Sequence, residues 1–193
     1  MKAIMISIQP QWVEKILNGE KTIEIRKTKP SCELPCKVYI YCTMPNKQEN
    51  RKPHSWEVVW LKRVVAEFTL NKVSTYDWDT DFLNTKQNMY YIKSSEADKT
   101  CLKYEQLCDY GKGKDLYGWH IDDLKIYDTP KELSEFSHYI PSNKCPKKEC
   151  GIDCEDCMSY DGEYETCLAL YYLHWQIKRP PQSWCYVEEL ENE

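Results

Sequence analysis

Residues 19–26 read Gly19-Glu20-Lys21-Thr22-Ile23-Glu24-Ile25-Arg26, and they contain the clearest strand pattern in the chain. Two isoleucines alternate with polar residues, and this period of two predicts a strand over residues 22–28. Ile23 and Ile25 then face the core, whereas Thr22, Glu24 and Arg26 share the opposite face. A carboxylate and a guanidinium are therefore expected side by side on this strand, with an ammonium just before it.

The flanking sequence predicts mostly strands. A short helix is expected over residues 9–19, because Pro10 suits a first helical turn and Gly19 suits a C-terminal cap. Other patterns predict strands at residues 2–8, 36–44, 58–73, 117–127 and 184–187, a helix at 95–110 and a helical turn at 129–136. Strands joined by one early helix favour an α+β class, with a small β-barrel and a few short helices packed on it.

The composition is that of a globular protein, with 41% hydrophobic and 30% charged residues among 193. This length favours a single domain over residues 1–193. The apolar runs are shorter than the ~20 residues of a membrane-spanning helix. The N-terminus reads as a strand rather than a signal peptide, so a cytoplasmic location and mostly reduced cysteines are expected. The chain has only 6 glycines and no glycine-rich phosphate loop, which argues against dinucleotide and P-loop enzymes.

Charge is distributed unevenly along the chain. Residues 1–75 carry 13 Lys or Arg against 7 Glu, which gives +6, whereas the whole chain carries −5. Such asymmetry can mark a basic binding face on an acidic body. The alternative is that segments of sequence do not correspond to faces of the folded protein.

Residues 7–26 resemble the opening of ASCH domains, which belong to the PUA-like barrels. The signature G-x-K-x-x-E-x-R of that family is matched at Gly19, Lys21, Glu24 and Arg26. Residues 118–121 also resemble a late strand of the family. The resemblance extends over about residues 1–75 and 115–136 and the last strand.

This resemblance implies a β-barrel with a cleft between the first helix and the signature strand. It also implies binding of RNA, or action on nucleic-acid components. Some relatives are similar to small amidohydrolases that act on N4-acetylcytidine, with a catalytic Lys, Thr and Glu. The Lys corresponds to Lys21, but the Thr position is occupied by Glu24. Thr22 is the hydroxyl nearest along the chain, about 6.6–7 Å away on the same strand face.

The signature residues also indicate ligand chemistry by themselves. Lys21 and Arg26 suit phosphate, and Arg26 also suits a base edge. Glu24 suits an exocyclic amino group such as that of cytosine or adenine. Trp119 and its neighbour Tyr117 are candidates for stacking on a base. The structural alternative is an ion pair between Glu24 and Arg26 that only pins the strand.

Three functions are compatible with these features. The favoured one is binding of a nucleic acid, chiefly RNA, or of a nucleotide through Lys21, Glu24, Arg26 and Trp119. The second is a small hydrolase acting on a modified nucleoside or RNA, with Lys21, Glu24 and Thr22 as candidate catalytic residues. The third is a protein-interaction module that uses the cysteine-rich excursion described next.

An excursion is expected at residues 137–180, and it contains a cysteine cluster at 145–157. Cys145, Cys150, Cys154 and Cys157 supply the four thiolates that a structural zinc ion needs. Cys167, His138 and His174 are possible substitutes for one ligand. Reduced thiols without metal and an iron–sulfur cluster remain open. The other cysteines are expected to be core filler, namely Cys32, Cys36, Cys42, Cys101, Cys108 and Cys185.

Overall fold

The computed structural model describes residues 1–45, 54–55, 57–79, 89–90, 92–139 and 176–190. The expected excursion at 137–180 lies largely outside these residues, as does the whole cysteine cluster at 145–157. The zinc site and the boundaries of the excursion therefore stay predictions.

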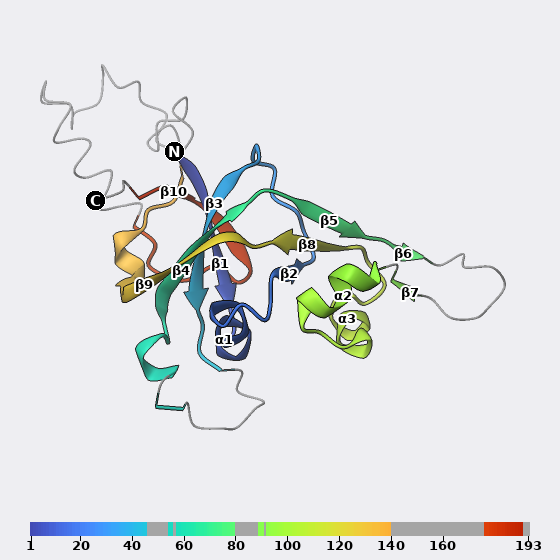
Figure 1. Ribbon diagram of the computed structural model, residues 1–193. Coiled ribbons are helices and arrows are strands. Elements are labelled where there is room, and N and C mark those ends of the chain that lie inside the picture. Colours follow the sequence, from blue (N-terminus) through green and yellow to red (C-terminus); the bar gives the residue numbers. More distant parts are fainter. Residues whose placement is uncertain (46–53, 56, 80–88, 91, 140–175, 191–193) are drawn as a thin grey trace, which may run out of the picture.

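The larger sheet has five strands in the order β10-β1-β3-β4-β9 (Figure 1). They are β1 (Lys2–Ile8), β3 (Cys36–Cys42), β4 (Arg63–Leu70), β9 (Asp122–Glu132) and β10 (Trp184–Glu188). β1 and β3 are parallel, and the other pairs are antiparallel. A parallel pair needs a crossover connection. Here it contains helix α1 (Pro10–Leu17) and strand β2 (Ile23–Arg26). Helix α1 contacts β3, and Arg26 of β2 donates a hydrogen bond to Ser7 of β1.

A second sheet has the order β2-β8-β5, with β8 (Leu116–His120) and β5 (Val73–Tyr76). Strands β6 (Trp78–Asp79) and β7 (Met89–Tyr90) form a short separate pair. Helices α2 (Ser94–Thr100) and α3 (Tyr104–Gly111) lie beside β2 (Figure 1). Two single helical turns occur at η2 (Glu57–Val59) and η3 (Leu133–Glu135). The α+β class is confirmed, but the described strands form separate sheets and do not close into a barrel.

β1 is central in the hydrophobic core because both of its faces are covered. Ile4 and Ile6 pack with Val13 of α1 in one apolar cluster, whereas Met5 packs with Phe136 in another. A strand buried on both faces reads as a continuous apolar run, which explains the weak alternation of residues 2–8.

Three local predictions differ from the structure, where other contacts override the local pattern. The helix expected at 95–110 is two helices, since Cys101 adopts a left-handed conformation with φ 54°. The helical turn expected at 129–136 is reduced to η3, because β9 continues to Glu132 and pairs there with Arg63 of β4. The strand expected at 117–127 is divided between β8 and β9, which belong to different sheets.

Among the described residues, the structure contains no helix of the length and apolar character needed to cross a membrane.

Candidate functional site

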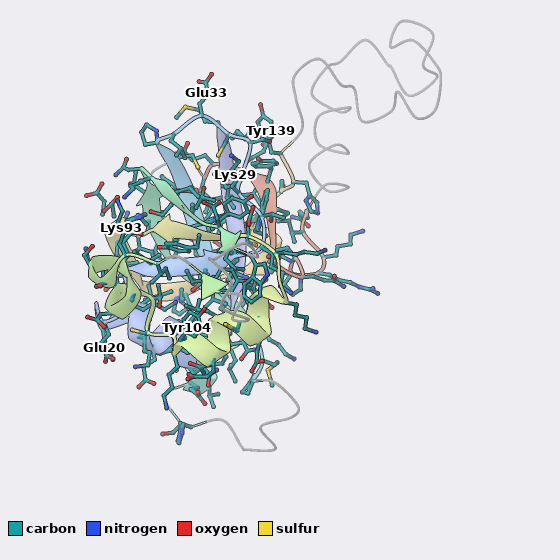
Figure 2. The ribbon with its side chains drawn as sticks, turned by 90° about the vertical axis from the view of Figure 1, so that its right-hand side faces the viewer. Glu20, Lys29, Glu33, Lys93, Tyr104 and Tyr139 are labelled. Carbon is teal, nitrogen blue, oxygen red and sulfur yellow. The ribbon has the colours of Figure 1, made fainter. Side chains whose placement is uncertain are left out.

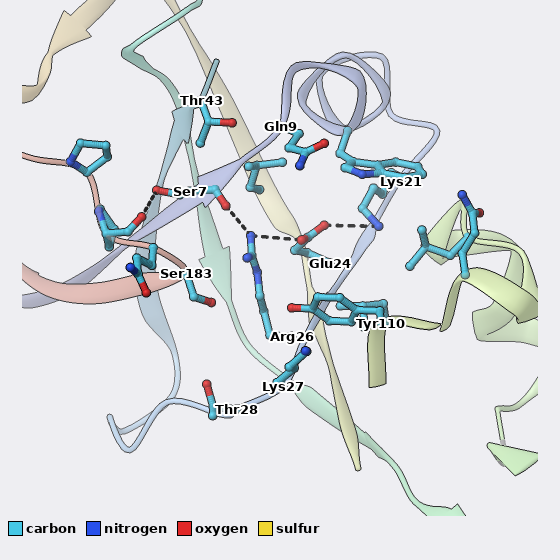
Figure 3. A pocket seen from close by; sticks show the side chains of 18 residues that line it. Ser7, Gln9, Lys21, Glu24, Arg26, Lys27, Thr28, Thr43, Tyr110 and Ser183 are labelled. Carbon is cyan, nitrogen blue, oxygen red and sulfur yellow. Dashed lines mark hydrogen bonds and ion pairs between the residues drawn. The ribbon is translucent and has the colours of Figure 1, made fainter. Parts of the chain in front are cut away.

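A cavity of about 910 Å³ opens between α1, β2 and α3. The chain at 180–183 closes it from the side of β1, where Ser7 holds it in place. The Ser7 hydroxyl donates to the carbonyl of Pro181 (2.7 Å), and the Ser7 N–H donates to that of Ser183 (2.9 Å). The lining residues are Ser7, Ile8, Gln9, Trp12, Lys21, Glu24, Ile25, Arg26, Lys27, Thr28, Thr43, Leu102, Gln106, Tyr110, Pro180, Pro181, Gln182 and Ser183 (Figure 3).

The three charged signature residues come together on one wall of this cavity. Glu24 lies between two cations, with Oε2 3.3 Å from Lys21 Nζ and Oε1 3.2 Å from Arg26 Nη2 (Figure 3). All three side chains are at most 9% exposed. Charges removed from water need paired partners, and this line of ion pairs supplies them. The structure therefore contains the expected Glu24–Arg26 ion pair, and it places that pair at a cavity.

Lys21 is held by further contacts on the protein side. Its ammonium donates to the carbonyls of Ile23 (3.0 Å) and Thr100 (2.5 Å), in addition to facing Glu24. An ammonium has three N–H donors, and two of those of Lys21 are already bonded to main-chain carbonyls while the charge faces Glu24. Lys21 therefore fastens the end of α2 to the start of β2.

Arg26 is less completely satisfied. Its Nη2 donates to the carbonyl of Ser7 (2.7 Å) and faces Glu24. Its Nε is buried and has no hydrogen-bond partner among the described residues. A buried donor without an acceptor destabilises a fold by about 1–3 kcal/mol, so it calls for an explanation such as a binding role.

Two of the side chains that line the cavity are aromatic residues that the sequence did not single out for binding. The ring of Trp12 lies 5.3 Å from Lys21 Nζ, and the ring of Tyr110 lies 4.7 Å from Lys27 Nζ. Burial raises the pKa of the Tyr110 phenol, while the neighbouring Arg26 guanidinium opposes that rise. The spacing of Trp12, Val13 and Ile16 is typical of the core-facing side of a helix, so it does not mark Trp12 as a binding residue. No local signal links Tyr110 to a site more than 80 positions earlier.

Trp119, a predicted base-stacking residue, lies elsewhere. Its side chain is 0% exposed, and its indole N–H donates to the carbonyl of Thr28 (3.3 Å). Its ring packs against Trp184 with a centroid distance of 5.6 Å. The expectation that it stacks on a ligand is wrong for this structure, because this side chain is packed in the core and does not line the cavity. Tyr117 also packs against that core and does not line the cavity.

Thr22 and His120 do not line the cavity either. Thr22 connects α2 to the residue that follows β8 through its main chain, donating to the carbonyl of Lys99 (3.0 Å) and accepting from the N–H of Ile121 (2.9 Å). His120 Nε2 lies 2.8 Å from the Ser74 hydroxyl, in a separate polar cluster with Glu96. Of the three candidate catalytic residues, the structure brings Lys21 and Glu24 together at the cavity and leaves Thr22 outside it.

The charge of the cavity differs from that of the chain. Among the described residues that line it, Lys21, Arg26 and Lys27 stand against one carboxylate, that of Glu24, which leaves two net positive charges. The whole chain carries −5. A concave, partly apolar site with fixed positive charge concentrates anions even on an acidic protein.

No family model and no curated protein matches the chain. Among solved structures, the chain is similar to ASCH from Zymomonas mobilis, with a TM-score of 0.53 and 18% identity over 97% of this chain and 88% of that chain. A serine-to-alanine variant of the same protein gives a TM-score of 0.53 and 18% identity, over 97% of this chain and 89% of that chain. At this level of identity the likeness shows the fold, which is that of ASCH proteins.

Proposed function

We propose that the cavity binds a nucleotide unit, chiefly of RNA, with the base inside and the phosphate at the rim. The observation that carries this proposal is the pair of net positive charges in a cavity that also presents two aromatic rings. Aromatic rings stack on bases of any sequence, and cations attract phosphate.

Each wall of the cavity has a distinct role in this proposal. Trp12 and Tyr110 supply flat apolar faces for the base. Glu24 has carboxylate lone pairs beyond its two ion pairs, and these can accept from an exocyclic amino group. Lys27 is exposed next to Tyr110, so its ammonium is available to a phosphate at the entrance.

The contacts of Lys21 favour binding over hydrolysis. A general base must be free to take a proton from the substrate or from water. The Lys21 ammonium instead donates to two carbonyls and faces Glu24. Thr22, the nearest hydroxyl along the chain, does not line the cavity. The protein-interaction alternative rests on cysteines outside the described residues.

The test is a fluorescence anisotropy titration against labelled single- and double-stranded RNA and DNA over a range of salt concentrations. Lys27→Gln is compared with Lys29→Gln, because both lysines are exposed and only Lys27 lines the cavity. We expect Lys27→Gln to weaken binding and to reduce the slope of log affinity against log salt concentration by about 1. Lys29→Gln should leave both the affinity and the slope unchanged. Calorimetric titration with cytidine and adenosine monophosphates tests a free nucleotide in the same way.

Two results would overturn the proposal. One is the absence of binding to every polymer and both mononucleotides. The other is an equal loss of affinity in the two lysine variants, because attraction to the general surface would then account for the binding. Turnover of acetylated cytidine that disappears in Glu24→Gln without unfolding would favour the hydrolase instead.

A further inference from the structure

Two thiols meet where the chain leaves the cavity wall and enters β3. Cys32 Sγ lies 3.1 Å from Cys36 Sγ. Cys36 is the first residue of β3 and is 8% exposed, while Cys32 is half-buried in the preceding segment. The sequence predicted both as core filler, but two sulfurs in contact have a chemistry that isolated core thiols lack.

We propose that Cys32 and Cys36 form a dithiol–disulfide couple that a small disulfide such as oxidised glutathione can oxidise. A disulfide bond is about 2.0 Å long, so the sulfurs need to approach by only ~1 Å. The backbone on both sides is already fixed. The N–H of Ser31 donates to the Tyr186 hydroxyl (2.7 Å), and Cys36 is paired with Leu70 of β4.

The environments of the two thiols assign them different roles. Burial, together with the hydrogen bond to Cys32, raises the pKa of the Cys36 thiol. Cys36 therefore keeps its proton while Cys32, which is more exposed, meets the oxidant first. The thiolate is the form that attacks a disulfide, so Cys32 is the attacking residue and Cys36 the resolving one.

The exchange balances in two steps. The Cys32 thiolate attacks one sulfur of oxidised glutathione, forms a mixed disulfide and releases one glutathione thiolate. Cys36 then gives its proton to that thiolate and attacks Cys32 Sγ, which releases the second glutathione as its thiolate. That thiolate takes up a proton from water, which replaces the one that Cys32 lost when it ionised. Two protein thiols are oxidised by two electrons in total, and one oxidised glutathione is reduced to two thiols.

No comparable pair occurs among the other described cysteines. Cys101 Sγ donates to the carbonyl of Glu20 (3.4 Å), and Cys42 Sγ donates to that of Thr43 (3.7 Å). The Cys32–Cys36 pair also lies in the segment that supplies Lys27 and Thr28 to the cavity. A bond here would tie that wall directly to the core strand β3.

The positions of Lys27, Glu33 and Lys37 allow a direct test. Trypsin releases residues 28–37 as one peptide, because the bond after Lys29 precedes a proline. A glutamate-specific protease then cuts this peptide after Glu33, between the two cysteines. Glu33 is exposed at one end of the molecule (Figure 2). The full chain is equilibrated with mixtures of reduced and oxidised glutathione, quenched in acid, labelled with N-ethylmaleimide and digested with both proteases.

We expect residues 28–33 and 34–37 to stay joined and unlabelled in the oxidising mixtures, and to separate with one label each in the reducing ones. Cys32→Ser must abolish the joined product, whereas Cys101→Ser must leave it unchanged. Cys32 is half-buried, so this variant is expected to fold even where a change at buried Cys36 fails. Separation of the fragments in every mixture, or their linkage to a different cysteine peptide, would overturn the proposal.

Discussion

The ammonium of Lys21 donates a 2.5 Å hydrogen bond to the main-chain carbonyl of Thr100, which lies 79 positions later in the chain. Thr100 is the last residue of α2, so this contact joins the end of that helix to the start of β2. The carbonyls at the end of a helix lack partners within the helix and carry partial negative charge. Lys21 thus stabilises the wall of the cavity, in addition to contributing a positive charge to it.

Replacing Lys21 by methionine is expected to destabilise the fold. The side chain keeps its length, but two buried carbonyls lose their donor and Glu24 loses one of its two cations. Removing one partner of a buried ion pair costs about 3–5 kcal/mol, and we expect the lower end because Glu24 retains Arg26. Urea unfolding followed by tryptophan fluorescence measures the difference.

Lys15→Met is the matched control for this prediction. Lys15 also pairs with a glutamate, Glu20, at 2.9 Å, but both side chains are exposed. Exposed ion pairs contribute little to stability, so this variant should unfold close to the wild type. Equal unfolding curves for the Lys21 and Lys15 variants would show that the buried contacts of Lys21 do not stabilise the fold.

Tyr110→Ala is expected to weaken nucleotide binding with little loss of secondary structure. Stacking of a base on an aromatic ring contributes ~1–3 kcal/mol, which corresponds to a loss of about 5- to 150-fold in affinity. Tyr104→Ala is the control, because Tyr104 lies on the same helix α3 but does not line the cavity. Anisotropy with single-stranded RNA distinguishes the two, and a loss that is equal in both variants would remove Tyr110 from the site.

The sequence predicted the part of the site that is contiguous and missed the part that folding brings in from a distance. Glu24 and Arg26 could be assigned to one wall because strand period two acts within a few residues, and Lys21 was linked to them by the signature. Tyr110 comes from another helix, and Pro181 is bound by Ser7 over 174 positions. No local pattern encodes such contacts.

The same limit explains why the sequence wrongly predicted that Trp119 stacks on a base. A tryptophan on a strand next to the signature is chemically suited to stacking on a base. Whether it faces solvent depends on what covers that face of the strand, and here Trp119 packs against Trp184 within the core. The pattern of the strand does not reveal which of its faces the core covers.

Gly118→Ala is expected to displace the signature strand. An added Cβ would lie 2.5 Å from the Tyr76 hydroxyl, 2.8 Å from Tyr76 Cε2 and 2.9 Å from Ile23 Cγ2. Overpacking of this kind costs about 1–3 kcal/mol. Because Ile23 is the first residue of β2, ligand affinity should fall along with stability.

A double-mutant cycle tests the cause of this loss. Tyr76→Phe removes the closest of the clashing atoms, so Gly118→Ala should cost less in that background than in the wild type. Urea unfolding of the four proteins gives the coupling free energy. Strict additivity would contradict the proposed clash and indicate that the glycine is needed for another reason.

His120 is expected to make the fold sensitive to mild acid. Burial lowers its pKa, and the positive charges of Lys72 and Lys99 lower it further, against the opposing carboxylates of Glu96 and Asp122. The unfolded chain therefore takes up a proton at a higher pH than the folded chain does. The free energy of unfolding should be constant above the ordinary histidine pKa of about 6.5 and fall as the pH drops below it.

Glu96 should cause a further fall in the free energy of unfolding at lower pH. Burial alone would raise its pKa, but hydrogen bonds from Lys72, Tyr76 and Ser74 outweigh burial and lower it. Its contribution is therefore complete above the ordinary glutamate pKa and is lost as the pH falls through its lowered pKa. The loss of stability caused by His120 should begin first, because histidine titrates at the higher pH.

Urea unfolding at a series of pH values between 5 and 8 separates the contribution of His120. His120→Gln should flatten the dependence below about pH 6.5. A pH profile that is the same in His120→Gln and in the wild type would show that the proton is taken up elsewhere. The cluster of Ser74, Glu96 and His120 would then fasten α2 to β5 and β8 without any response to pH in this range.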